Sequence, residues 1–241
     1  MMKIIISPSK TQNESGIMNG FETLIELDKS LKLFSILRNL TKKDLQKLMK
    51  TSSKLTNEVY QMYQNFKVSA PRYTAISLYS GIVFDQLELS AYNQNQKDYM
   101  NANLLILSAM YGYLSPNTKI WPYRLDMTMK ANNINLYDYW QKTIDQYFND
   151  QECIINLASN EFSKMLKNQK EKIINIDFLV RKADGKLRSV SYYSKKARGQ
   201  FLNAMIKGQV KDIDTIKSIF VEGYQYSEEH SYDKNLVFIK N

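Results

Sequence analysis

The sequence is poor in the residues that most often build metal sites and nucleophilic active sites. Its 241 residues include one cysteine, Cys153, and one histidine, His230. A lone cysteine cannot form an intramolecular disulfide, and Cys153 precedes two isoleucines, where burial as a small hydrophobic residue is the ordinary state. His230 lies in a polar segment typical of a solvated turn. These scarcities argue against a Cys/His zinc site, a Cys–His pair and a Ser-His-Asp triad, so we expect no metal and no cofactor.

Long hydrophobic runs are absent as well. No apolar run approaches the roughly 20 residues that span a bilayer. The apolar start at residues 3–6 stops at Pro8, which is too short for the core of a signal peptide. With 44% apolar residues the chain can fill one large core. No linker, repeat or low-complexity tract is visible, so we expect a cytoplasmic monomer with one domain over residues 1–241 and no membrane contact.

Basic residues are in excess. Lysine and arginine number 33 against 24 acidic residues, which gives a formal charge of +9. Such a charge favours a polyanionic partner, because basic side chains neutralise phosphates and release counterions. Only six of these residues are arginines, so compositional drift toward lysine explains the charge equally well. Each arginine is therefore the more informative, because its planar fork binds phosphate or carboxylate as lysine cannot.

Hydrophobic spacing predicts an α/β fold. Strand-like runs lie at residues 3–6, 73–79, 104–108, 152–156, 173–181, 187–193, 220–226 and 236–239. Helical spacing covers residues 24–37, 41–49, 53–66, 135–147, 197–207 and 213–220. Ala183-Asp184-Gly185 is a strong hairpin signal between two of the strands. We predict one compact domain with a mixed β-sheet, flanking helices and a basic cleft.

Polar side chains follow two of the predicted strands. Ser7, Ser9 and Lys10 come after the first strand, and Asn156 and Ser159 lie where the strand at 152–156 passes into a helix. Ligands of α/β folds gather outside the carboxyl ends of strands, so both segments are candidate binding loops. Two ordinary explanations stay open. Ser7 and Ser9 can bond their own backbone in a turn, and Ser159 can serve only as a helix N-cap.

Three cations lie at another predicted junction, from the strand at 187–193 to the helix at 197–207. Lys195, Lys196 and Arg198 fall there. Unpaired backbone N–H groups at a helix start attract anions, and cations placed beside them would reinforce an anion site. The alternative is a solvated basic helix start.

The segment Trp121-Pro122-Tyr123-Arg124-Leu125-Asp126-Met127 places a rare arginine two residues before an aspartate. In an extended chain this spacing puts Arg124 and Asp126 on one side. They can pair with each other or both address a substrate, and the sequence does not decide between these.

Six motifs in order make the chain resemble the YaaA family of bacterial peroxide-stress-response proteins over nearly its whole length. They are Ile6-Ser7-Pro8-Ser9-Lys10-Thr11, Leu107-Ser108-Ala109-Met110-Tyr111-Gly112-Tyr113-Leu114, Pro122-Tyr123-Arg124-Leu125-Asp126-Met127, Leu136-Tyr137-Asp138-Tyr139-Trp140, Asn156-Leu157-Ala158-Ser159-Asn160-Glu161 and Lys195-Lys196-Ala197-Arg198-Gly199. The resemblance implies a compact α/β fold with a basic cleft, binding to duplex or distorted DNA, and a role in limiting damage from peroxide and unincorporated iron. It also implies a helix-hairpin-helix near residues 197–220, whose glycine pattern is incomplete here. The family's motif positions in this chain are Ser7, Lys10, Arg124, Asp126, Asn156, Ser159, Lys195, Lys196 and Arg198.

Three hypotheses follow. In the first, Lys10, Arg124, Lys195, Lys196 and Arg198 bind DNA phosphates. In the second, the mixed polar set suits an enzyme acting on a nucleotide or another phosphorylated small molecule, with Asp126 as the candidate general base. In the third, the basic cleft is incidental. No other catalytic role is assigned to any residue. All three depend on whether distant motif residues meet around one cavity.

Overall fold

The computed structural model describes residues 2–18 and 22–241, and its fold is of the α/β class that the sequence predicts. In this part of the chain eight strands form one mixed sheet, in the order β11-β12-β9-β8-β1-β5-β6 with β10 paired to β9. They are β1 (Met2–Ile6), β5 (Leu104–Ser108), β6 (Gly112–Leu114), β8 (Cys153–Asn156), β9 (Ile173–Arg181), β10 (Leu187–Arg188), β11 (Tyr224–Tyr226) and β12 (Asn235–Lys240). Two small sheets pair β2 (Thr11–Gln12) with β4 (Tyr79–Ser80) and β3 (Tyr73–Thr74) with β7 (Lys119–Ile120).

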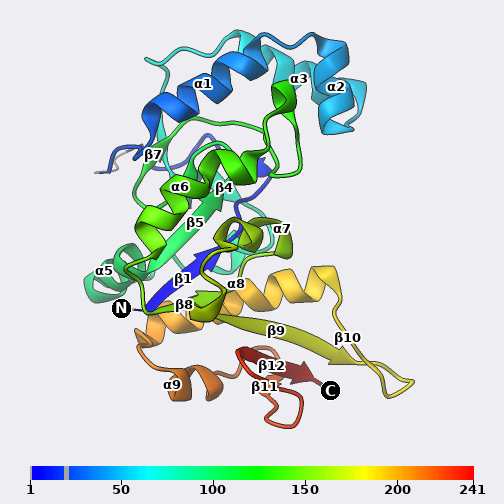
Figure 1. The fold of residues 1–241 in the computed structure, drawn as a ribbon. Coiled ribbons are helices and arrows are strands. Elements are labelled where there is room, and N and C mark those ends of the chain that lie inside the picture. The colour runs from blue at the N-terminus through cyan, green and yellow to red at the C-terminus, as the bar shows by residue number, and fades with distance from the viewer. Residues whose placement is uncertain (1, 19–21) are drawn as a thin grey trace.

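Helices flank this sheet, and further helices lie at one end of the molecule (Figure 1). They are α1 (Leu27–Arg38), α2 (Lys42–Met49), α3 (Ser53–Gln64), α4 (Ala75–Leu78), α5 (Gln94–Asn103), α6 (Leu136–Phe148), α7 (Asn160–Ser163), α8 (Ser191–Gly208) and α9 (Ile213–Lys217). Short 3₁₀ turns are η1 (Phe84–Gln86), η2 (Ala131–Asn133), η3 (Lys164–Leu166) and η4 (Lys170–Lys172). Helices α1, α2 and α3 gather at the end of the molecule far from the C-terminal strands (Figure 1). Thr41 and Ser52 cap α2 and α3 by accepting hydrogen bonds from backbone N–H groups.

The core follows the central strands. Every residue of β5 is buried, and so are the three isoleucines of β1. Continuous apolar runs of this kind are typical of parallel strands that are covered on both faces. None of the helices in the described residues combines the length and the apolar character that crossing a bilayer requires. The prediction of a single domain over residues 1–241 stays a prediction.

The strand order defines where the sheet can hold a ligand. Strands β12, β9, β8, β1 and β5 are neighbours and run parallel. Numbered in chain order, these five parallel strands read 2-1-3-4-5 across the sheet from β5 to β12. Sheets of this order bind ligands outside the carboxyl ends of the first and third strands, where the direction of winding reverses. Those two strands are β1 and β8.

The prediction of a strand at residues 73–79 is wrong for the middle of that range. Residues 75–78 form the single helical turn α4 between the two-residue strands β3 and β4. The backbone N–H groups of Ala75 and Ile76 donate to the carbonyls of Thr118 and Pro116, so a neighbouring loop replaces a strand ladder. Tertiary contacts override the strand propensity of the local sequence here.

The strand predicted at residues 187–193 is also shorter than expected. Strand β10 ends at Arg188, and helix α8 begins at Ser191. Tyr192 and Tyr193 lie in the first turn of the helix and are 57% and 49% exposed. Lys195, Lys196 and Arg198 therefore lie beyond the first turn, whose backbone N–H groups belong to residues 191–194. The expected placement of these cations at the helix start is wrong.

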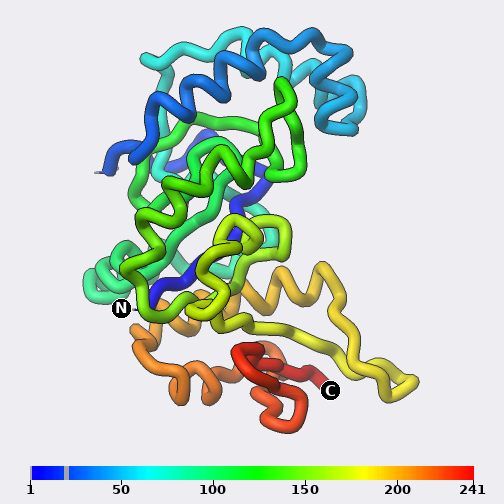
Figure 2. The backbone as a smooth tube through the Cα atoms, in the orientation of Figure 1, coloured from blue at the N-terminus to red at the C-terminus, as the bar shows by residue number. Residues whose placement is uncertain are grey.

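The hairpin prediction is confirmed. The Lys182 N–H donates to the Lys186 carbonyl (3.0 Å), and Gly185 adopts a φ of +76°. A positive φ is readily available only to glycine. The hairpin projects from the body of the molecule (Figure 2).

Candidate functional site

A cavity of about 360 Å³ lies at the carboxyl ends of β1 and β8, where the strand order predicts a ligand. We call it the strand-end cavity. The segment after β1, the segment after β8, the loop before η1 and helix α8 all contribute to it. Its lining residues are Ser7, Pro8, Ser9, Lys10, Thr11, Gly81, Ile82, Val83, Phe84, Leu157, Ser159, Glu161, Phe162, Lys195 and Arg198. Six of the ten predicted site residues, from three distant parts of the chain, thus meet here: Ser7, Ser9, Lys10, Ser159, Lys195 and Arg198.

Ser7 and Ser159 join the two strand ends. The Ser7 hydroxyl donates to the Ser159 hydroxyl (3.1 Å) and accepts from the Ser159 backbone N–H (2.8 Å). Ser159 occupies the N-cap position of α7, but its side chain makes no capping hydrogen bond. The simple N-cap explanation is therefore wrong. Ser9 does behave as a turn residue, because its Oγ accepts from the Thr11 N–H (3.2 Å).

Lys10 connects the strand-end cavity to a smaller pocket. Its Nζ lies 2.6 Å from Asp126 Oδ2, and the two side chains are 59% and 13% exposed. The smaller pocket, of about 50 Å³, is lined by Pro8, Lys10, Arg124 and Asp126 among others. Burial alternates along residues 121–127, as in an extended chain, and Arg124 and Asp126 are both partly exposed. Asp126 is nevertheless paired with Lys10 and not with Arg124.

Two arginines carry buried nitrogens without a protein partner. The Nε atoms of Arg124 and Arg198 are buried and form no hydrogen bond within the described part of the chain. Burial lowers the pKa of the Arg198 guanidinium, and the nearby Asp177 carboxylate offsets part of this effect. A buried polar group without a partner is costly, and more so when it is charged. Arg198 lines the strand-end cavity and Arg124 lines the smaller pocket, so each places a guanidinium charge beside a space that an anion can enter.

Two predicted residues lie elsewhere. Lys196 forms an ion pair with Glu222 and does not line the strand-end cavity. Asn156 donates to Asn175 Oδ1 (2.7 Å), accepts from the Ala158 N–H (2.9 Å), and lines a separate cavity. Their predicted roles are not supported by this placement and stay predictions. The overall basic character of the cleft also stays a prediction, because acidic side chains accompany the cations.

Sequence reasoning missed three residues around the cavity. Glu161 lines it, with Oε1 accepting from the Met127 N–H (3.0 Å). Its position two residues after Ser159 was the available signal. Asp177 faces Arg198 from β9, and burial raises the pKa of its carboxyl. Gly199 packs so closely that a Cβ added to it would lie 2.3 Å from the Val83 carbonyl oxygen, so the motif's glycine has a packing role.

The arrangement can hold an anion at the strand-end cavity. Exposed Lys195 and Lys10 lie at its margin, and Arg198 lies deeper. Within residues 2–18 and 22–241, no group of three or more His, Cys, Asp or Glu side chains is placed to hold a metal ion.

Comparisons with known proteins agree with this assembly of motifs. The family model described as "Peroxide stress protein YaaA" matches residues 2–230. A UPF0246 protein of Fusobacterium nucleatum subsp. nucleatum is 39% identical, covering 99% of each chain. One of Finegoldia magna is 35% identical over 100% of this chain and 98% of its own, and one of Rickettsia felis is 33% identical over 99% and 100%. The motifs that meet at the carboxyl ends of β1 and β8 lie within this full-length match, and the chain belongs to the YaaA family of peroxide stress proteins.

Proposed function

We propose that this peroxide stress protein works as a cytoplasmic monomer that binds DNA, duplex or distorted, and so limits damage linked to unincorporated iron. Lys10, Arg124, Lys195 and Arg198 would hold phosphate oxygens at the strand-end cavity and the pocket beside it. Lys196 would add a weaker contact, because Glu222 already pairs with it. The observation that carries the proposal is that Arg198, from inside the strand-end cavity, and exposed Lys195 and Lys10, at its margin, line the same space.

DNA binding gives a physical route to protection from iron. Cations condense around the DNA phosphates, and a protein that neutralises those phosphates releases them. Iron ions held near DNA by its charge would be displaced in the same way. This mechanism needs no iron ligands in the protein, in keeping with the scarcity of cysteine and histidine.

Exposed tyrosines support a distorted DNA as one form of the partner. Tyr192 and Tyr193 precede Lys195 in α8 and are 57% and 49% exposed. Aromatic rings beside cations can stack on unpaired bases while the cations contact the backbone. A regular duplex keeps its bases stacked inside, so it would use only the cations. The helix pair α8 and α9 covers the region where the family resemblance implies a helix-hairpin-helix.

The second candidate is an enzyme acting on a nucleotide or another phosphorylated small molecule in the same cavity. The strand-end cavity lies at the switch point between β1 and β8, and this location favours an enzyme. Its volume of about 360 Å³ lies within the range of roughly 300–1,000 Å³ of small-molecule sites. Carboxylates accompany the cations, which pure backbone binding does not require. Asp126 stays the candidate general base.

The deciding experiment is fluorescence anisotropy with a labelled duplex and a labelled DNA with an unpaired segment, at 50 and 200 mM salt. Four phosphate contacts would give a slope of about −3.6 in log affinity against log salt, or about 150-fold weaker binding across this range. Lys195→Gln should weaken binding and reduce the slope by about 0.9. Lys196→Gln is the matched control and should change binding less.

Binding that ignores salt, or no binding to either DNA, would contradict the first candidate. Thermal-shift measurements with a panel of nucleotides test the second, and stabilisation that is lost in Arg198→Gln would support it. A strain carrying Lys195, Lys196 and Arg198 changed to Ala tests the third hypothesis, an incidental cleft. If that strain survives peroxide as well as the wild-type strain, the result would support an incidental cleft.

A further inference from the structure

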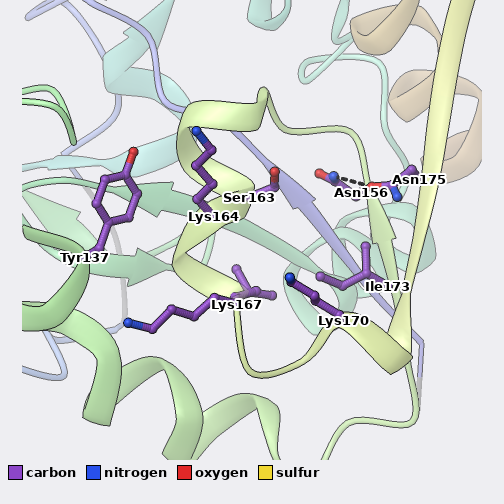
Figure 3. Close-up of a pocket in the computed structure, with 9 residues that line it drawn as sticks. Tyr137, Asn156, Ser163, Lys164, Lys167, Lys170, Ile173 and Asn175 are labelled. Atoms are coloured by element: carbon purple, nitrogen blue, oxygen red, sulfur yellow. Dashed lines mark hydrogen bonds between the residues drawn. The ribbon is translucent and has the colours of Figure 1, made fainter.

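A second cavity, of about 560 Å³, shares none of its lining residues with the strand-end cavity. We call it the amide pocket (Figure 3). Tyr137 of α6 lies on one side and the ends of β8 and β9 on the other, with the segment from α7 to η4 between them. Its lining residues are Tyr137, Asn156, Ser163, Lys164, Leu166, Lys167, Lys170, Ile173 and Asn175. Of the predicted site residues, only Asn156 is here.

A ladder of amides forms one side of the pocket. Asn156 Nδ2 donates to Asn175 Oδ1 (2.7 Å), and Asn175 Nδ2 donates to Asn235 Oδ1 (2.9 Å). These residues are register partners on the adjacent parallel strands β8, β9 and β12. An amide nitrogen carries two hydrogens, and the ladder uses one hydrogen of each. Asn156 and Asn175 therefore each retain a donor for a ligand.

The remaining walls are partly apolar. Leu166 and Ile173 are 0% and 9% exposed. Ile173 lies on the side of the asparagines, and Tyr137 lies on the other side of the turn that carries Ser163 and Lys164 (Figure 3). The Tyr137 hydroxyl already donates to the Glu161 carbonyl (2.9 Å), which fixes the ring in place. A flat apolar group can lie against the side chain of Ile173, next to the amides.

Three lysines border the pocket at intervals of three residues. Lys167 pairs with Asp138 at 3.1 Å. Within residues 2–18 and 22–241, the ammonium groups of Lys164 and Lys170 form no hydrogen bond, ion pair or ring contact. No aspartate or glutamate is among the lining residues. Two free ammonium groups therefore border a site rich in hydrogen-bond donors.

We propose that the amide pocket binds a small heteroaromatic anion. Its carboxylate or phosphate would lie between Lys164 and Lys170, and acceptor atoms on its ring edge would receive hydrogen bonds from the amides of Asn156 and Asn175. Its ring would lie against Ile173. The pocket volume is within the range of roughly 300–1,000 Å³ that small molecules occupy.

The two cavities are separated by a short stretch of chain. Leu157, Ser159, Glu161 and Phe162 face the strand-end cavity, whereas Asn156, Ser163 and Lys164 face the amide pocket. Since no lining residue is shared, substitutions can test the amide pocket without touching the residues proposed to bind DNA.

The test is titration of the full chain with adenosine monophosphate, nicotinate and uncharged adenosine, by calorimetry and by NMR of the asparagine side-chain amides. Adenosine monophosphate represents a phosphate-bearing ligand and nicotinate a carboxylate-bearing one. At least one anion should bind and shift the amide resonances of Asn156 and Asn175, and adenosine should bind at least tenfold more weakly than adenosine monophosphate.

The double variant Lys164→Gln/Lys170→Gln should weaken anion binding at least tenfold. The double variant Lys43→Gln/Lys47→Gln makes the same charge change on exposed positions of α2 and should leave it unchanged. Arg198→Gln should also leave it unchanged, which separates this proposal from DNA binding. The proposal is overturned if neither anion binds at millimolar concentration, if the Lys164/Lys170 variant binds like wild type, or if Arg198→Gln abolishes binding.

Discussion

Two glycines of helix α8 should respond oppositely to the same substitution. A Cβ at Gly199 would lie 2.3 Å from the Val83 carbonyl oxygen and 2.8 and 2.9 Å from Cγ and Cβ of Gln86. A Cβ at Gly208 would meet only Val210 Cγ2, at 3.4 Å. Both glycines are helical, so alanine gains up to about 1 kcal/mol of helix propensity at either position. Their surroundings alone distinguish them.

The magnitude for Gly199→Ala follows from these distances. Non-bonded atoms attract best at about 3.5 Å, so the contact with Val83 is too short by more than 1 Å. Its partner is a backbone oxygen, which cannot rotate away as a side chain can. Overpacking typically costs about 1–3 kcal/mol, and occasionally more. After the gain in helix propensity we expect a net loss of about 1–2 kcal/mol for Gly199→Ala, and a gain of up to about 1 kcal/mol for Gly208→Ala.

Thermal and urea denaturation measure both effects. For a chain of this size about 1 kcal/mol corresponds to roughly 2–4 °C, so Gly199→Ala should melt about 2–8 °C lower. Val83 lines the strand-end cavity, so the same variant should also bind DNA more weakly at a temperature where it is folded. Equal midpoints for the two alanine variants would refute the packing argument. Lower stability with unchanged DNA affinity would refute its link to the cavity.

Two further predictions concern the strand-end cavity. Burial raises the pKa of Asp177 above the unfolded value of about 3.9, so the ionised carboxylate lowers stability once the pH rises above that value. Asp177→Asn should therefore melt higher than wild type at pH 7 and match it near pH 3; a lower midpoint at pH 7 would show that the attraction to Arg198 dominates. Ser7→Ala leaves the Ser159 N–H without its acceptor and should lower the free energy of unfolding by about 1–3 kcal/mol. Ser159→Ala removes only the hydrogen bond between the two hydroxyls and should lower it by about 0.5–1.5 kcal/mol. Equal urea midpoints for these two serine variants would contradict that assignment.

Periodicity predicted the central strands because their residues are buried on both faces. The isoleucines of β1 and the leucines of β5 leave little choice of structure. The carboxyl-end rule then located Ser7 and Ser159, since the ends of neighbouring parallel strands meet. It could not predict that the two hydroxyls bond each other, because sequence does not specify that β1 and β8 are adjacent.

Aromatic segments were harder to predict. Tyr192 and Tyr193 have high strand propensity, yet both lie in the exposed first turn of α8. Because these residues lie in a helix, the side chains of Lys195 and Lys196 must point in different directions. Consecutive residues of a helix point about 100° apart, while residues three apart share a face. Lys195 and Arg198 accordingly line the cavity, and Lys196 points to Glu222.

The motif Lys195-Lys196-Ala197-Arg198-Gly199 thus combines three tasks in little more than one helical turn. Lys195 and Arg198 face the cavity, Lys196 holds the C-terminal part of the chain through Glu222, and Ala197 and Gly199 pack inward. The absent Cβ of Gly199 lets the helix approach the loop that carries Val83. That approach places Arg198 deep enough for its Nε to lose contact with water, so a larger residue at 199 would move the cation that an anionic ligand needs.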